Sequence, residues 1–531
     1  MGLGIRSLVP AYGPTRTLSS LRKDWVCLFA AVMLCIGAGS ANAQITSSTL
    51  ITDAKLVDGT GAPLRISSVR IEGDRITEVG DLSPRPGDIV VDAGGLVLSP
   101  GFIDTHSHHD IDLFANPNAL AAVSQGVTTI IVGQDGESEL PIGQLFSRMK
   151  SDPVALNIGT YVGHNSIRAA VLGGDYKRTA TRAEIAQMRE RVRAAMQTGA
   201  IGLSTGLEYD PGIYSSQSEV LTLAKEAARW GGRYISHIRS EDQFLWKALD
   251  EIVEIGRVTK IPVQVSHMKL AMIDWWGQAD RYLAVLDRAR AQGVNVSGDV
   301  YPYEYWQSTL TVMFPKRDFA NRASAEFALK HLAPDYGLQL SRFSPDPSLV
   351  GKTVAQIAAL RGIDSPNALM QLIAESQVAG AQESVIGTSM RGDDVERLIA
   401  WPHSNISSDG LLADRHPRGA GSFTKILRYY VREKQLLTLE QAVHKMTGAA
   451  ANNMGLLDRG VIRPGARADL VLFDQDIVAD RATTDDASAL SVGITAVWVN
   501  GQVVLKDGRP TGNRPGQLVL RGEKKGRPGS R

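Results

Sequence analysis

The chain has 531 residues, and its 57 lysines and arginines nearly balance its 56 aspartates and glutamates, so the formal net charge is +1. This length exceeds one typical domain and predicts one large unit with a smaller companion. Since no basic stripe with interleaved aromatic residues is present, the sequence excludes a nucleic-acid-binding protein, and we expect no nucleic-acid partner.

Residues 1–43 have the order of a secretory signal peptide. Basic residues such as Arg22 and Lys23 precede an apolar run over residues 25–39, and Ala41-Asn-Ala43 matches an A-x-A cleavage site. The run of about 15 residues is shorter than the roughly 20 that span a bilayer, which disfavours a membrane anchor. We expect a periplasmic or secreted protein with no stable membrane insertion of the mature chain.

Both cysteines, Cys27 and Cys35, lie inside this predicted signal peptide. The mature chain would then contain no thiol. It would need no disulfide, and any metal ion would have to be held by nitrogen and oxygen ligands.

Short alternating runs broken by turn residues occur near both ends of the remaining chain, a pattern typical of β-hairpins. They cover residues 50–58, 67–79, 89–92, 468–473 and 494–504. Asn500-Gly501 favours a type I′ turn. These runs predict one small β-sandwich domain built from both termini, with residues 44–95 as its N-terminal part and residues 456–520 as its C-terminal part.

Between these ends, eight apolar strand-like runs alternate with amphipathic helices. The runs are residues 96–104, 127–133, 154–162, 200–204, 234–237, 263–267, 294–299 and 405–408. Thr181-x-x-Glu184 is a capping box that opens one of the helices, and Gly199 ends it. Eight such units predict an α/β fold, a (β/α)8 TIM-type barrel over residues 96–455. An open doubly wound sheet is the alternative, but no G-x-G-x-x-G motif supports it.

A long segment, residues 316–401, separates the seventh and eighth predicted strands. Connections of this length usually carry function or an additional subdomain, so we expect an insertion in the barrel. Residues 521–531 are charged and glycine-rich, which predicts a disordered tail.

Histidines and carboxylates follow the apolar runs. His106 and His108 project from the same face of an extended strand because they are two residues apart. The other candidates at strand ends are Asp135, His237, His267 and Asp409. Because chemistry in a (β/α)8 barrel lies at the carboxyl ends of its strands, we expect these six side chains to converge on one metal site.

Several of these motifs resemble those of the amidohydrolase superfamily, and within it the N-acyl-D-amino-acid deacylases. The matching segments are Pro100-Gly-Phe-Ile-Asp-Thr-His-Ser-His108, Gly202-Leu-Ser-Thr-Gly-Leu-Glu-Tyr-Asp-Pro-Gly212, Ser236-His-Ile-Arg-Ser-Glu241, Ser408-Asp-Gly410, His416-Pro-Arg418 and Gly465-Ala-Arg-Ala-Asp-Leu470. The resemblance covers nearly all of the predicted mature chain. It implies a metal-dependent hydrolase that releases a free D-amino acid and a carboxylate from an N-acyl-D-amino acid.

The resemblance also implies roles for individual residues. His106, His108, His237 and His267 match metal ligands for one or two zinc ions, and Asp409 matches the catalytic aspartate. Zinc lowers the pKa of bound water to about 7 and polarises a scissile carbonyl, and a neighbouring carboxylate can transfer the proton. The family typically has cysteine in an Asn-Cys-Gly turn where this chain has Gln134-Asp135-Gly136. Asp135 is therefore the expected fifth ligand, a harder one than thiolate.

Lys269, Tyr301, Ser308 and Arg418 match the residues that hold the α-carboxylate of the substrate. Arginine suits this role because its planar fork binds a carboxylate bidentately. The apolar stretch Val312-Met-Phe314 predicts a small-molecule substrate with a hydrophobic or neutral D-side chain. The alternatives are a cyclic-amide or dipeptide hydrolase of the same superfamily and a non-catalytic scaffold that retains the fold.

Overall fold

The computed structural model describes residues 48–378 and 380–522. The predicted signal peptide and residues 523–531 of the predicted tail lie outside this part of the chain. Arg521, the first residue of that tail, donates hydrogen bonds to the carbonyl oxygens of Trp230 and Met196 at 2.5 and 2.9 Å.

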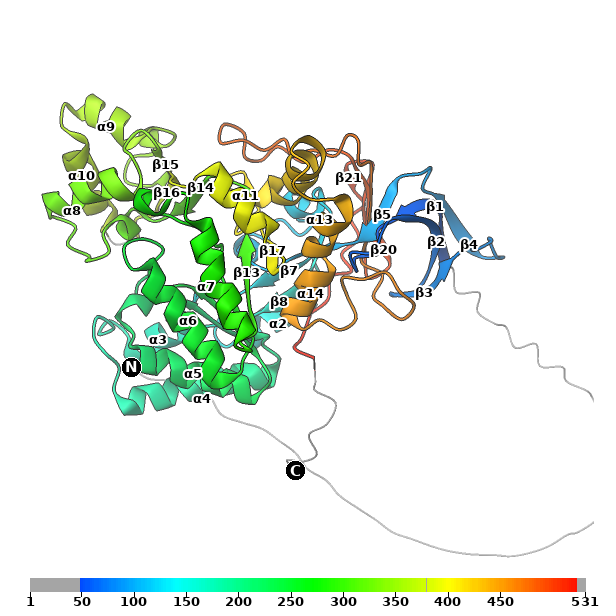
Figure 1. The fold of residues 1–531 in the computed structure, drawn as a ribbon, viewed down its shortest axis with the longest axis horizontal. Helices are drawn as coiled ribbons and strands as arrows, with labels where there is room; N and C mark the ends of the chain where they lie inside the picture. Colours follow the sequence, from blue (N-terminus) through cyan, green and yellow to red (C-terminus); the bar gives the residue numbers. More distant parts are fainter. Residues whose placement is uncertain (1–47, 379, 523–531) are drawn as a thin grey trace, which may run out of the picture. The chain divides into compact units, whose positions relative to one another are not determined.

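Both ends of the described chain join one nine-stranded sheet (Figure 1). Its strands are β1 (Ser48–Leu56), β2 (Arg65–Glu72), β3 (Arg75–Gly80), β4 (Asp88–Asp92), β5 (Val97–Pro100), β18 (Leu470–Phe473), β19 (Ile494–Val499), β20 (Gln502–Lys506) and β21 (Arg509–Pro510). The order is β21-β20-β19-β18-β5-β1-β2-β3, with β4 paired to β1. The two ends meet where β5 pairs with β18, antiparallel, and with β1, parallel.

Side chains from both ends form the core of this sheet, including Ile51, Leu98, Leu472 and Trp498. The predicted hairpin between β19 and β20 is present. Its turn residues Asn500 and Gly501 have φ values of 47° and 78°, as a type I′ turn requires.

All eight strands predicted for the central region are present, in two parallel sheets. The first sheet contains β6 (Phe102–Asp104), β7 (Val127–Val132) and β8 (Asn157–Thr160). The second runs β17-β13-β12-β11-β10-β9, with β9 (Val162–Gly163), β10 (Gly202–Gly206), β11 (Arg233–His237), β12 (Val263–Val265), β13 (Val296–Val300) and β17 (Ser404–Ile406). The third predicted strand divides at Tyr161 into β8 and β9, and thus contributes to both sheets.

The first predicted strand is divided at Gly101, so that β5 belongs to the nine-stranded sheet and β6 to a parallel sheet. A Cβ atom at this position would lie 2.2 Å from Cγ2 of Thr128. Glycine is therefore required where the chain passes between the two sheets.

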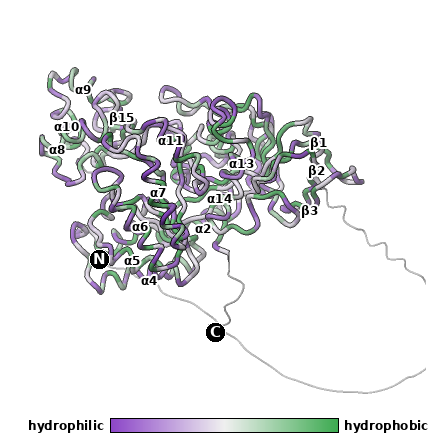
Figure 2. The backbone as a smooth tube through the Cα atoms, viewed as in Figure 1, coloured by the Kyte–Doolittle hydropathy of each residue, from purple (hydrophilic) through white to green (hydrophobic). Residues whose placement is uncertain are grey.

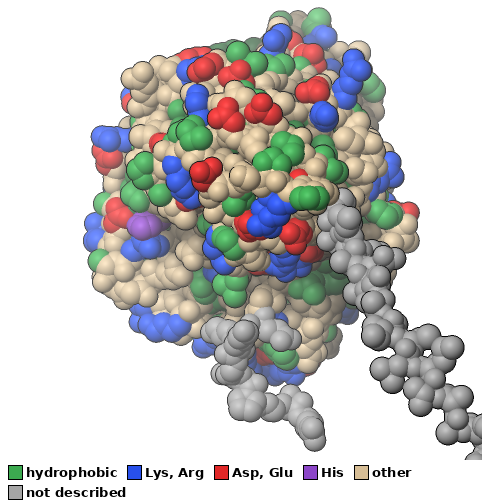
Figure 3. Space-filling model, turned by 90° about the vertical axis from the view of Figure 1, so that its right-hand side faces the viewer, with side chains coloured by type: hydrophobic (Ala, Val, Ile, Leu, Met, Phe, Trp, Pro, Cys, Tyr) green, Lys and Arg blue, Asp and Glu red, His purple; other side chains and the backbone are tan. Residues whose placement is uncertain are grey.

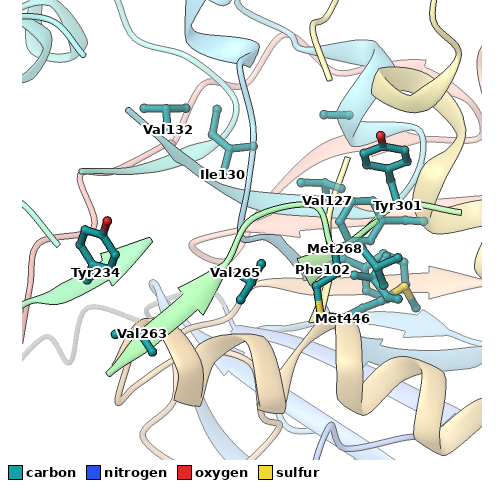
Figure 4. Packing of buried hydrophobic residues seen from close by; sticks show 14 of the residues in the cluster. Phe102, Val127, Ile130, Val132, Tyr234, Val263, Val265, Met268, Tyr301 and Met446 are labelled. Atoms are coloured by element: carbon teal, nitrogen blue, oxygen red, sulfur yellow. The ribbon is translucent and has the colours of Figure 1, made fainter. Parts of the chain in front are cut away.

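Helices follow most of the parallel strands. They are α1 (Leu120–Val123), α2 (Gly143–Ser151), α3 (His164–Leu172), α4 (Arg182–Thr198), α5 (Gln217–Arg229), α6 (Leu245–Thr259), α7 (Ala279–Ala291), α11 (Gly392–Ala400), α12 (Arg418–Lys425), α13 (Leu439–Met446) and α14 (Gly448–Met454), with the single turns η1 (His109–Ile111), η2 (Gly212–Tyr214) and η3 (Ile273–Trp275) and the π-helix η7 (Ile426–Glu433). The predicted capping box of α4 is present, and Gly199 ends the helix with φ 117°. Figure 4 shows buried residues of the resulting core, among them Ile130 and Val132 of β7 and Val263 and Val265 of β12.

The segment between β13 and β17 contains an additional unit with its own hydrophobic core. It consists of β14 (Tyr305–Ser308), η4 (Leu310–Met313), α8 (Arg322–Phe327), η5 (Ala328–Leu332), β15 (Leu338–Phe343), η6 (Pro347–Leu349), α9 (Val354–Arg361), α10 (Ser365–Ser376) and β16 (Glu383–Thr388). Its antiparallel sheet has the order β14-β16-β15. In Figure 1, α8, α9 and α10 lie around this sheet. The unit begins at β14, before residue 316, and α11 packs against α7 and β13 of the central region.

Hydrophobic and hydrophilic stretches alternate along the chain in Figure 2. Among residues 48–378 and 380–522, no helix combines the length and the apolar character needed to cross a membrane. On the face shown in Figure 3, acidic and basic side chains are interspersed, in keeping with the nearly balanced charge of the sequence.

Candidate metal and active site

The structure brings the six predicted strand-end residues together. His106 and His108 follow β6, Asp135 follows β7, His237 is the last residue of β11, His267 follows β12 and Asp409 follows β17. Because the strands are parallel, their carboxyl ends lie at the same edge, and the side chains beyond them can converge.

The first pair of histidines faces two carboxylates. His106 Nε2 lies 3.5 Å from Asp135 Oδ1 and 3.3 Å from Asp409 Oδ1. His108 Nε2 lies 3.3 Å from Asp135 Oδ2 and 3.2 Å from the same Asp409 Oδ1. Two imidazole nitrogens and two carboxylates thus surround one small volume.

The second pair of histidines is linked to Asp135 through His267. His267 Nε2 is 3.6 Å from Asp135 Oδ1, and His237 Nδ1 is 3.0 Å from His267 Nε2. Asp135 therefore contacts a member of each histidine pair, since Oδ1 lies near His106 and His267 and Oδ2 lies near His108.

This arrangement suits a divalent cation. His106 Nε2 and Asp135 Oδ1 are buried and have no hydrogen-bond partner among the described residues. Leaving such groups unsatisfied costs about 1–3 kcal/mol each, and a metal ion would satisfy both. His106, Asp135, His267 and Asp409 place one potential ligand atom each within 4.8 Å of one another. Nitrogen and carboxylate oxygen donors are ligands that zinc accepts.

Three further carboxylates each contact a ring nitrogen of one of these histidines. Asp299 Oδ1 lies 3.3 Å from His106 Nδ1, Glu208 Oε2 lies 2.9 Å from His237 Nε2, and Glu241 Oε1 lies 3.0 Å from His267 Nδ1. A carboxylate on the second ring nitrogen fixes the tautomer and the direction of a metal-binding histidine.

No role for Asp299, Glu208 or Glu241 is predicted from the sequence. An acidic residue at or just after a strand was the available signal, because Asp299 lies in β13 and Glu208 follows β10. Asp299 is also tied to its surroundings, since it accepts hydrogen bonds from Gln264 Nε2 at 2.7 Å and from the His267 backbone N–H at 2.9 Å.

The electrostatics of the cluster favour added positive charge. Burial lowers the pKa of His108, but its hydrogen bonds to Asp135 and Asp409 outweigh burial and raise the pKa to about 10. Burial raises the pKa of Asp409, yet the nearby Arg418 and His106 hold it below its ordinary value. Asp135 and Asp409 thus retain their charge and draw a proton onto His108, a demand that a bound cation would also meet. The pKa of His237 is instead lowered to about 4, mainly by burial, so this imidazole stays neutral, as a metal ligand must be.

The four predicted substrate-binding residues Lys269, Tyr301, Ser308 and Arg418 line one pocket of about 520 Å³ together with His237, His267 and Asp409. Two of them are paired with acidic residues of the site. Lys269 Nζ donates to Glu241 Oε1 and Oε2 at 2.9 and 2.8 Å, and Arg418 forms an ion pair with Asp409.

Other polar atoms in the pocket have no partner. Tyr301 Oη and Arg418 Nε are buried and make no hydrogen bond within the described part of the chain. They offer donors to a ligand, while Lys269 Nζ lies 6.0 Å and the Arg418 guanidinium carbon 5.1 Å from the centre of the Tyr301 ring. Donors from Tyr301 and Arg418 thus remain available to a ligand in this pocket.

The pocket also has apolar lining residues. Its lining includes Ala271, Trp306, Val312, Met313 and Leu332. Val312 and Met313, predicted from the sequence to define a hydrophobic region, do reach the pocket, whereas Phe314 packs into the core of the inserted unit. Among the described residues that line the pocket, Lys269 is the only lysine and Arg418 the only arginine. Both are paired with carboxylates.

Known proteins share this organisation. An amidohydrolase family model matches residues 89–326 and 318–505. The chain is 36% identical over 490 residues to an N-acyl-D-glutamate deacylase of Alcaligenes xylosoxydans xylosoxydans, which covers 88% of this chain and 95% of that protein. It is 35% identical over 497 residues to a D-aminoacylase of the same organism, covering 89% and 97%.

A solved structure agrees. The crystal structure of an N-acyl-D-glutamate deacylase from Bordetella bronchiseptica, complexed with zinc and a phosphonate inhibitor that mimics the tetrahedral intermediate of the reaction, matches with a TM-score of 0.80. It is 36% identical, and the match covers 89% of this chain and 99% of that one. The family model and these relatives show that the chain belongs to the amidohydrolase family.

Proposed function

We propose that this protein is a zinc-dependent N-acyl-D-amino-acid deacylase. The observation that carries the proposal is that members of the candidate cation site, His237, His267 and Asp409, line one pocket together with Lys269, Tyr301 and Arg418. Similarity to deacylases and a D-aminoacylase over most of the chain supports it.

For the metal, we propose one or two zinc ions held by His106, His108, Asp135, His237 and His267, with Asp409 beside them. When bound, zinc would activate water and polarise the scissile amide carbonyl. Asp135 would help to hold the metal, because its Oδ1 faces His106 and His267 and its Oδ2 faces His108.

Asp409 is our proposed catalytic residue. Its Oδ1 faces His106 and His108, while its Oδ2 is engaged by Arg418. Oδ1, which faces the candidate cation site, can accept a proton from the attacking water and return it to the departing amine nitrogen. The Arg418 contact keeps the carboxylate ionised and fixes its orientation before the reaction.

Arg418, Lys269, Tyr301 and Ser308 are the proposed substrate-binding residues. The unpartnered Tyr301 Oη and Arg418 Nε are available to a substrate α-carboxylate. With that group held at this end, the side chain of the substrate points toward the apolar lining. Among the described lining residues, no lysine or arginine other than the paired Lys269 and Arg418 is present to bind a second carboxylate. We therefore propose that an apolar D-side chain is preferred over an acidic one.

We further propose that the two parallel sheets form one (β/α)8 barrel with the nine-stranded sheet as a β-sandwich domain. Hydrogen bonds from Tyr161 N to Val132 O at 3.0 Å and from Ile201 N to Thr160 O at 2.8 Å connect the two sheets on one side. On the other side, Asp409 N donates to His106 O at 2.9 Å, which connects the segments after the first and last strands.

For location, we propose export to the periplasm or medium with removal of residues 1–43. This proposal rests on the order of charged, apolar and small residues in that segment.

The function is tested by the release of free amine from matched N-acetyl-D- and N-acetyl-L-amino acids. Leucine, phenylalanine, methionine, glutamate and aspartate derivatives are compared with purified zinc-loaded protein. We expect hydrolysis of the D-enantiomers, with leucine, phenylalanine and methionine ahead of the acidic pair. A preference for N-acetyl-D-glutamate would contradict the apolar assignment. Hydrolysis of L-enantiomers alone, or no amine release from any compound, would contradict the deacylase assignment.

A further inference from the structure

One arginine outside the pocket fixes its apolar wall. The turn η4 contributes Val312 and Met313 to the lining, and Arg317 follows it. The Arg317 Nη1 donates hydrogen bonds to the carbonyl oxygens of Thr311 and Phe314 at 3.0 and 3.2 Å. The guanidinium group thereby closes the turn upon itself.

The same guanidinium group reaches a segment that is distant in sequence. Arg317 Nη2 donates to the carbonyl oxygen of Glu208 at 2.5 Å, and its Nε donates to Asp210 Oδ1 at 3.1 Å. Only 11% of the Arg317 side chain is exposed. The guanidinium group thus donates to four acceptors in a mostly buried setting. The two charge-assisted hydrogen bonds to Glu208 and Asp210 connect the inserted unit firmly with the segment after β10.

That segment carries parts of the candidate site. The Glu208 carboxylate contacts His237 Nε2 at 2.9 Å, and Tyr209 lines the pocket. Asp210 is held in turn, because Tyr176 and Tyr214 donate to its Oδ2 at 3.4 and 3.5 Å. Arg317 therefore connects two segments that both line the pocket, η4 and the segment after β10.

The backbone at Arg317 supports a positioning role. Its φ is 56°, in the left-handed region that residues with a Cβ rarely adopt. Such a conformation persists where the surroundings determine it, as the four hydrogen bonds do here. The first residue of η4 is fixed as well, because Leu310 N donates to both oxygens of Glu383 at 2.9 Å.

We propose that Arg317 is a specificity-determining positioning residue, which sets the space available for the substrate side chain without touching the substrate. This inference rests on the proposed deacylase function. With the guanidinium fork removed, η4 can move away from the segment 208–210, and Val312 and Met313 lose their fixed distance from the opposite side. Discrimination between large and small apolar side chains should then weaken.

The test compares three variants of the mature zinc-loaded protein. Arg317→Met keeps the aliphatic length and removes the fork, and Arg317→Lys keeps one charged donor. Arg322→Met is the matched control in the same unit, because Arg322 pairs at the surface with Glu326 and Asp364, at 2.9 and 2.8 Å, and its side chain is 48% exposed. The readouts are kcat and KM for N-acetyl-D-leucine and N-acetyl-D-alanine, zinc content, Tm, and amide hydrogen exchange over residues 207–214 and 310–316.

We expect Arg317→Met to lower the leucine-to-alanine ratio of kcat/KM about tenfold, mainly through KM for the leucine substrate, with zinc content equal to that of the control. Exchange in both segments should be faster than in Arg322→Met, and Arg317→Lys should be intermediate. An unchanged ratio with slow exchange would overturn the proposal, as would a loss of Tm with no change in the ratio. If Arg317→Met does not fold, Arg317→Lys carries the same comparison.

Failure of the deacylase assignment would look different. In that case the unmodified protein releases no amine from either substrate. Hydrogen exchange then tests only whether Arg317 holds η4 and residues 208–210 together. Equal exchange rates in Arg317→Met and Arg322→Met would show that it does not.

Discussion

Three of the proposed site residues have a backbone conformation that residues with a Cβ rarely adopt. The φ values are 52° for Asp135, 32° for His267 and 49° for Asp409. Each costs on the order of 1–3 kcal/mol, so the surrounding structure must impose it. These residues follow β7, β12 and β17, and the strain is therefore concentrated where the candidate cation site lies.

Asp135 gives the most specific prediction about the metal. We expect Asp135→Ala to lower bound zinc and deacylase activity together, because its two oxygens face both histidine pairs. Metal analysis of the purified variant measures this. Asp507→Ala is the matched control, since Asp507 also has a positive φ of 50° but lies in an exposed turn. Unchanged zinc content in Asp135→Ala would show that the aspartate is not a ligand.

Asp409 is predicted to transfer the proton. Asparagine preserves its shape and can still contact Arg418, but it cannot accept the proton from water. We expect Asp409→Asn to lower kcat by about 10²- to 10⁴-fold, the range typical of general acid–base groups, with little change in circular dichroism or zinc content. If Asp409 only anchors the loop after β17, activity should fall in proportion to Tm instead. Near-normal kcat would remove Asp409 from the mechanism.

At the scale of the elements, the ends of the parallel strands organise the site, and this much could be predicted from the sequence. An apolar run that ends in Ser-His, as at His237 and His267, indicates both the strand and the direction of its last side chain. His106 and His108 share a face through their two-residue spacing.

Other contacts depend on packing between distant segments. The pairing of Arg317 with Asp210 arises because the inserted unit and the segment after β10 fold next to each other. Glu208 meets His237 because β10 and β11 are neighbouring parallel strands, a pairing that neither strand indicates by itself. The division of the first predicted strand at Gly101 likewise follows from the close approach of Thr128 in a different strand. A single apolar run cannot show that it serves two sheets.

The inserted unit gives a prediction about pH. Burial raises the pKa of Glu383 from 4.5 to about 7, although its hydrogen bond from Leu310 N lowers it. Between about pH 4.5 and 7 the folded protein therefore holds this proton more tightly than the unfolded chain, and the free energy of unfolding falls as the pH rises. Above pH 7 this contribution is fully lost.

Glu383→Gln removes the ionisation and keeps an oxygen that can accept from Leu310 N. The variant should match the unmodified protein near pH 4.5 and exceed its free energy of unfolding at pH 8 by about 1–3 kcal/mol. Urea unfolding at the two pH values measures the difference. A difference that is the same at both values would show that Glu383 does not titrate in this range.

For the whole molecule, both ends of the described chain are needed for one sheet, since β5 pairs with β1 and with β18. Removal of the predicted signal peptide would leave this sheet intact, because β1 begins at Ser48, after Ala43. We expect the exported protein to have the intact mass of a chain that begins at Gln44. A full-length chain recovered in the membrane fraction would contradict export and cleavage.

The central claim is that the strand-end cluster holds zinc and that this zinc enables hydrolysis of N-acyl-D-amino acids. The most direct measurement is a titration of chelator-treated protein with zinc, in which bound metal and amine release from N-acetyl-D-leucine and N-acetyl-L-leucine are followed together. We predict that the metal-free protein is inactive, and that activity toward the D-enantiomer returns in proportion to the first or second zinc ion bound. Full activity without metal, or equal release from the two enantiomers, would contradict the claim.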